Sequence, residues 1–200
     1  MNIPFRVIAR NALVAAALIG ASTAQAHTGH GTSGLYEGLL HPFGLDHLLA
    51  MVAVGVWSVS ALPNHKAWWG PVTFMLALIV GALLGVAGIH VPFLENLIAM
   101  SVVLFGAMLI ASRIQLPTKL GLGLIAVAAS FHGIAHGAET PEAGFAMYAL
   151  GFLLTTAVLH FGGVLAGISI RRVFTNKNSW VFTMLGVGCS GAGMYLLSQL

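Results

Sequence analysis

The chain has 200 residues, of which 58% are hydrophobic and only 6% carry a charge. Water-soluble domains contain about 25% charged residues, so this composition and a mean hydropathy of +0.94 exclude an ordinary soluble protein. The net charge of +3 comes from a few scattered basic residues. That scatter excludes the dense basic surface that nucleic-acid binding requires. The composition therefore indicates an integral membrane protein.

The first 26 residues contain the three parts of a secretory signal. Two basic residues precede a short apolar run and a small-residue cleavage pattern: Arg6, Arg10, Ala12–Gly20 and Ala24-Gln25-Ala26. We predict a signal peptide over residues 1–26 and a mature chain that begins at His27. An uncleaved first helix is the alternative, although its apolar core is short for a full span.

Six further apolar stretches follow, separated by residues that favour turns or stop helices. They cover residues 42–62, 69–89, 93–112, 119–137, 143–170 and 179–199. Five of them are close to the ~20 residues that cross a bilayer, and residues 143–170 make a longer stretch. The sequence therefore predicts an all-α bundle of six transmembrane helices over residues 27–200.

Closely spaced glycines predict tight helix packing in this bundle. They are Gly81 with Gly85, Gly133 with Gly137, Gly163 with Gly167, and the run Gly186, Gly188, Gly191 and Gly193.

The charges predict the orientation of the six spans. Export of the mature N-terminus places the loops after the first, third and fifth spans in the cytoplasm. All basic residues of the predicted mature chain fall in those loops: Lys66, Arg113, Lys119, Arg171, Arg172 and Lys177. This distribution obeys the positive-inside rule. We expect a multi-pass protein of the bacterial inner membrane with both mature termini in the periplasm.

The first chemical cluster lies at the start of the first predicted span. The sequence reads His41-Pro42-Phe43-Gly44-Leu45-Asp46-His47, with Ala50-Met51 shortly after. Pro42 in a first helical turn and Asp46 near the positive end of the helix dipole fit an ordinary helix start. That explanation does not cover the two histidines, and ionisable groups at membrane depth usually serve a function.

The second cluster closes the fourth predicted span. It reads Phe131-His132-Gly133-Ile134-Ala135-His136-Gly137-Ala138-Glu139. On a continuous helix His132, His136 and Glu139 project from one face, because they are spaced by four and three residues. A histidine pair at i and i+4 is a common way to offer two nitrogen ligands to one divalent cation. The predicted topology places both clusters at the outer face of the membrane.

The two clusters together offer four imidazoles and two carboxylates but no thiolate. Cys189 is the single cysteine, so a cysteine-based metal cluster is excluded. Imidazole suits nickel, copper, zinc and iron, which points to a first-row divalent ion. Ligand chemistry alone does not choose among these metals.

Both motifs resemble the two signatures of the HupE/UreJ family of bacterial nickel permeases, and the resemblance extends over the whole chain. It implies nickel supply to hydrogenase or urease, and some members of the family are linked to cobalt. By resemblance, the metal-binding residues are His41, Asp46, His47, His132, His136 and Glu139. The transported Ni²⁺ is then a substrate, with Co²⁺ and Zn²⁺ as alternatives, and no tightly bound cofactor is expected.

The sequence therefore predicts a transporter rather than an enzyme. It contains no G-x-x-x-x-G-K-[ST] motif and gives no sign of an ATPase subunit. The alternative is a membrane-embedded zinc hydrolase that uses the same His/Asp cluster, with Glu139 as general base. A b-type haem protein with histidine axial ligands is a third interpretation. Passive or coupled transport, the oligomeric state and the destination enzyme stay open.

Other residues carry weaker signals. His27 and His30 would provide an outer chelate next to a new N-terminus, or a plain polar start to the chain. His90 and Glu95 would widen the outer vestibule or simply begin a helix. His160 would relay an ion inward or pack in the core. Three tryptophans, Trp57, Trp68 and Trp69, are expected near the membrane interface.

Overall fold

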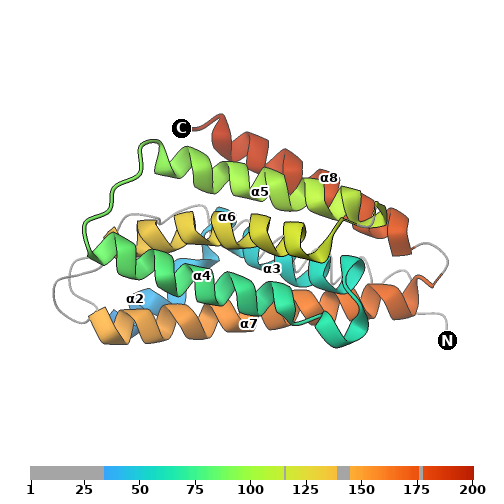
Figure 1. The fold of residues 1–200 in the computed structure, drawn as a ribbon, viewed down its shortest axis with the longest axis horizontal. Helices are drawn as coiled ribbons and strands as arrows, with labels where there is room; N and C mark the ends of the chain where they lie inside the picture. The colour runs from blue at the N-terminus through green and yellow to red at the C-terminus, as the bar shows by residue number, and fades with distance from the viewer. Residues whose placement is uncertain (1–33, 115, 139–144, 176–177) are drawn as a thin grey trace.

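The computed structural model describes residues 34–114, 116–138, 145–175 and 178–200. Every regular element in these ranges is a helix (Figure 1). The long helices are α3 (Leu45–Ala61), α4 (Trp69–Val86), α5 (Leu94–Ile110), α6 (Thr118–Ala138), α7 (Phe145–Val173) and α8 (Asn178–Leu197). The shorter ones are α2 (Gly34–Leu40) and the 3₁₀ turns η1 (His41–Phe43), η2 (Asn64–Lys66) and η3 (Ala111–Arg113). The all-α prediction is confirmed, whereas the predicted signal peptide lies outside the described residues.

Four segments are long and apolar enough to cross a membrane, and they contain α4, α6, α7 and α8. The pair Gly34–Phe43 and Leu45–Ala61 makes a fifth candidate if it is counted as one bent span. Helix α5 is apolar but has only 17 residues, which is ~26 Å of helix against a hydrocarbon core of ~30 Å. The described residues thus contain four to five candidate spans.

The first predicted span is not one continuous helix. We expected a helix from residue 42, but α3 begins only at Leu45, and α2 with η1 precedes it at an angle of 69°. Pro42 lies in the first turn of η1 rather than in the long helix. Gly44 then takes an extended backbone conformation with ψ of 139°, which ends η1 and starts α3 in a new direction. His41 therefore sits in a turn beside α3.

The helices pack as neighbouring pairs (Figure 1). Helix α4 lies along α6, α3 and α2 lie along α7, and α5 lies along α8. The α3 helix also contacts α5, which joins the α5–α8 pair to the rest of the bundle. Met51, Phe74 and Phe105 are among the largest fully buried side chains of the core between them.

Several glycines lie where two helices come into close contact, as the spacing predicted. A Cβ on Gly81 would collide with the Ser130 carbonyl of α6, and one on Gly163 would collide with the Val52 carbonyl of α3. Such contacts let backbones approach without the hydrophobic effect that drives packing in water. The prediction for α8 was partly wrong, because Gly186 and Gly193 contact α5 whereas Gly188 and Gly191 face open space.

Trp57 is buried inside the bundle, so its ring is not exposed as the side chains of an interfacial aromatic belt are. Its side chain is 2% exposed and its ring packs against Gly121 of α6, where there is no side chain to displace it. Trp68 and Trp69 are each 46% exposed beside the first turn of α4, and the Lys66 ammonium lies 4.6 Å from the Trp69 ring. Of the three tryptophans that we expected near the interface, Trp68 and Trp69 are exposed and Trp57 is not.

The basic residues of the described ranges gather at one end of the helices. Lys66 precedes α4 and Lys119 lies in the first turn of α6, whereas α6 carries its two histidines near the opposite end. Arg171 and Arg172 occupy the last turn of α7 rather than the loop in which we expected them. The Arg171 guanidinium donates to the Val59 carbonyl and to the Asn64 side-chain oxygen, which ties α7 to the end of α3.

Candidate metal centre

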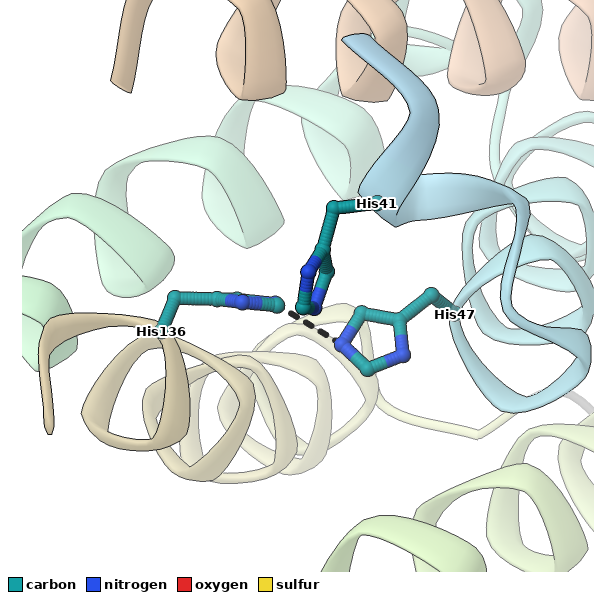
Figure 2. Close-up of side chains that lie close together, drawn as sticks. All are labelled: His41, His47 and His136. Carbon is teal, nitrogen blue, oxygen red and sulfur yellow. Dashed lines mark hydrogen bonds between the residues drawn. The ribbon is translucent and has the colours of Figure 1, made fainter. Parts of the chain in front are cut away.

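Three imidazoles from three elements converge at the end of the bundle opposite the basic residues. His41 comes from η1, His47 from the first turn of α3 and His136 from the last turn of α6. Figure 2 shows their rings pointing toward one another, and one nitrogen from each lies within 4.8 Å of the others. His47 and His136 are buried and His41 is half-buried. Such a group can hold a metal ion.

The tightest contact joins His47 and His136, whose Nε2 atoms are 2.7 Å apart (Figure 2). Two lone pairs cannot face each other at this distance, so the nitrogens must share a proton or a cation. Metal–imidazole bonds of ~2.0 Å would hold two ligands of one ion about 3 Å apart or more. A small outward movement of either ring would therefore admit an ion between the two nitrogens.

Asp46 holds the other nitrogen of His47. Its Oδ1 atom accepts hydrogen bonds from the backbone N–H and from the ring Nδ1–H of His47, each at 2.8 Å. The bond to Nδ1 leaves the Nε2 lone pair of His47 directed at His136. Carboxylates that hold the far nitrogen of a metal-binding imidazole orient the ring and raise its basicity. Asp46 thus supports His47 here, in addition to its predicted role as a ligand.

His132 lies one turn deeper than His136 and is fully buried. Its ring centroid is 4.8 Å from that of His47. Its Nε2 atom lies 2.8 Å from the Ser101 hydroxyl of α5, and that hydroxyl itself donates to the Ile98 carbonyl at 2.6 Å. His132 is therefore near the cluster of His41, His47 and His136 without being one of its three members. The last predicted ligand, Glu139, lies outside the described residues.

Sequence reasoning missed three residues beside the site. Ser101 is a lone hydroxyl in an apolar helix, and no sequence signal marks it. Phe152 packs on His136 with ring centroids 4.1 Å apart, and Tyr148 lies 6.0 Å from His41. Both come from α7, whose start carries no polar motif that could have revealed them.

A cavity of about 200 Å³ opens between α4 and α7 and reaches His136. Apart from His136 and Tyr148, its lining residues are apolar, among them Leu78, Leu83 and Phe145. One side of the histidine cluster therefore borders an apolar space.

The geometry disfavours a haem between His47 and His136. Axial imidazoles on opposite sides of a haem iron stand about 4 Å apart, given metal–nitrogen bonds of ~2.0 Å. The observed separation of 2.7 Å leaves no room for the macrocycle.

Fold and site together define a multi-pass helical membrane protein with a buried cluster of imidazoles that can hold a metal ion. Residues 14–196 match the family described as HupE / UreJ protein. Over 184 residues the chain is 42% identical to Protein HupE of Rhizobium leguminosarum bv. viciae. The aligned region covers 91% of this chain and 94% of that protein. The chain belongs to the HupE/UreJ family, as its two motifs predicted. No solved structure matches it.

Proposed function

We propose that the protein is an inner-membrane permease that takes up Ni²⁺ from the periplasm, with Co²⁺ as the alternative substrate. The observation that carries this proposal is the convergence of His41, His47 and His136 at one end of the bundle, in a chain of the HupE/UreJ family. Imidazole is a good ligand for nickel and cobalt. In this proposal six spans cross the membrane, α5 among them, and a signal peptide is removed.

The histidine cluster is the entry site of the permease. It must bind the ion tightly enough to replace part of its water shell and loosely enough to release it. His41, His47 and His136 supply neutral nitrogen ligands, with His132 one turn further in. Asp46 and Glu139 supply negative charge, which attracts a divalent cation to the mouth of the bundle. Asp46 also orients His47 through the 2.8 Å contact between Oδ1 and Nδ1.

Uptake through this site does not require ATP. A divalent cation that moves inward gains roughly 4.6 kcal/mol per 100 mV of membrane potential, because each elementary charge gains ~2.3 kcal/mol. This is about a 2000-fold accumulation at equilibrium, since each 1.4 kcal/mol is tenfold. The membrane potential alone would thus concentrate scarce nickel.

The experiment is initial-rate uptake of radiolabelled Ni²⁺ into proteoliposomes that contain the purified protein and have a negative potential inside. We expect rapid uptake by the wild type and at least about a tenfold loss in His47→Ala and His136→Ala. Excess Co²⁺ should compete more strongly than Mg²⁺, because Mg²⁺ prefers oxygen ligands. His65→Ala is the matched control, because His65 is exposed at the opposite end of the bundle.

A zinc hydrolase of the membrane is a second candidate, which the apolar cavity beside His136 favours. Such an enzyme needs a metal with an open coordination position next to a space that a lipid chain can enter. Protein that transports no Ni²⁺, purifies with firmly bound zinc and hydrolyses a lipid amide or ester would support this candidate and overturn the permease.

A further inference from the structure

His160 of α7 is a buried histidine outside the cluster of His41, His47 and His136. Its side chain is 2% exposed, and its Nδ1 atom lies 2.8 Å from the Thr156 carbonyl oxygen. A carbonyl only accepts hydrogen bonds, so Nδ1 must carry the proton. The lone pair of the neutral ring is then on Nε2. This atom is buried and has no hydrogen-bond partner among the described residues.

His132 repeats this arrangement. The hydroxyl proton of Ser101 is donated to the Ile98 carbonyl, so Ser101 Oγ must accept from His132 Nε2–H. The lone pair of His132 is then on Nδ1, which is also buried without a partner in the described part of the chain. Metal-binding histidines are commonly held this way, with one nitrogen donating to an oxygen and the other free to bind the ion.

The side chain of Phe74 connects the two histidines. Its ring centroid is 5.7 Å from that of His132 and 4.8 Å from that of His160. The Thr156 hydroxyl, one turn before His160, is a further buried oxygen without a partner within the described ranges. An aromatic face attracts a cation without binding it through an atom. The two histidines with unpartnered nitrogens therefore both lie next to the same aromatic ring.

We propose that His160 is an inner binding position for the transported ion, which Nε2 coordinates after the ion leaves the outer cluster by way of His132 Nδ1. This inference rests on the proposed function, since it gives the permease a second site inside the bundle. A histidine that only packs in the core does not need a fixed tautomer that leaves a buried lone pair without a hydrogen-bond partner. The ligand is a borderline divalent cation such as Ni²⁺, because the donor is a neutral imidazole.

Two substitutions separate ligation by His160 from packing. His160→Asn places an amide near the position of Nδ1 and keeps the hydrogen bond to the Thr156 carbonyl. It has no atom at the position of Nε2 that could coordinate the ion. His160→Gln reaches the position of Nε2 and gives up that bond. We expect the Asn variant to lose at least about tenfold in Ni²⁺ uptake rate and the Gln variant to lose less. A packing role predicts the reverse order.

Equilibrium dialysis of Ni²⁺ against the purified variants provides the control. The affinity of the outer cluster should stay within about threefold of the wild type in His160→Asn, whereas His47→Ala should lose it. Wild-type uptake rates in His160→Asn would overturn the inner site and leave the permease intact. Absence of uptake by the wild type itself would instead overturn the permease.

A second measurement covers the case in which His160→Asn fails to fold. His160→Cys is made in a Cys189→Ser background, so that the new thiol is the single one, and its alkylation by N-ethylmaleimide is timed with and without Cd²⁺. We expect Cd²⁺ to slow the reaction about tenfold and to leave a His65→Cys control unchanged. A thiol that reacts equally fast with Cd²⁺, or does not react at all, contradicts the proposal.

Discussion

The chemistry of this protein depends on which imidazole nitrogen carries a proton. Three of the four buried histidines in the described residues have one nitrogen held by an oxygen: Asp46 holds His47, Ser101 holds His132 and the Thr156 carbonyl holds His160. Such second contacts decide the tautomer and the direction of each lone pair. The effect of a single substitution can therefore be predicted from the contact it removes.

Asp46→Asn should weaken metal binding while it preserves the fold. The amide oxygen still accepts the His47 ring N–H and backbone N–H, but the negative charge that raises the basicity of the ring is lost. Loss of such a partner typically costs 10–100-fold in metal affinity. We expect a loss in this range for Ni²⁺ in equilibrium dialysis, with His65→Ala unchanged. An unaltered affinity would show that Asp46 has no influence on the site.

At the scale of the helices, adjacent glycines of α7 have different roles. Gly163 meets the α3 backbone at Val52 and Gly55, whereas a Cβ on Gly162 would meet nothing within 4 Å. In Gly163→Ala the added methyl must push α3 away, and overpacking of this kind costs about 1–3 kcal/mol. The higher helix propensity of alanine stabilises the folded state by less than about 1 kcal/mol.

We therefore expect Gly163→Ala to lower the melting temperature of the detergent-solubilised protein and Gly162→Ala to leave it unchanged or raise it. Thermal unfolding followed by the loss of the monodisperse peak in size-exclusion chromatography measures this difference. Equal melting temperatures for the two variants would contradict the assigned α3–α7 contact.

The helices themselves could be predicted from the sequence, because apolar runs and turn residues report element boundaries directly. The bend before α3 could not, since Pro42 and Gly44 fit a first helical turn as well as a 3₁₀ turn. The burial of Trp57 could not be predicted either, because it depends on the absence of a side chain at Gly121 on a different helix. Tertiary partners of this kind leave no periodic signal.

At the scale of the whole molecule, the two motifs predicted one site of six residues, and the bundle brings three of them, His41, His47 and His136, into one cluster. The motifs do not distinguish ligands from the residues that hold them. The role of Asp46 at His47, and the deeper position of His132 against Ser101, depend on contacts between side chains. Spacing along one helix contains no information about α5.

The distribution of charge over the whole bundle predicts its orientation. Lys66, Lys119 and Arg171 lie at one end, and the histidine cluster lies at the other. Because basic ends stay in the cytoplasm, the cluster should face the periplasm. Two exposed histidines test this orientation, since His65 lies in η2 near the basic end and His90 lies between α4 and α5 near the other.

Each of these two positions is changed to cysteine in a Cys189→Ser background. A membrane-impermeant maleimide is then added to spheroplasts before and after lysis. We expect His90→Cys to react in intact spheroplasts and His65→Cys to react only after lysis, because the bilayer blocks the reagent from the cytoplasmic end. The opposite pattern would place the histidine cluster in the cytoplasm. The same residues would then bind the ion at the exit of the proposed uptake route, and the proposed entry site would be wrong.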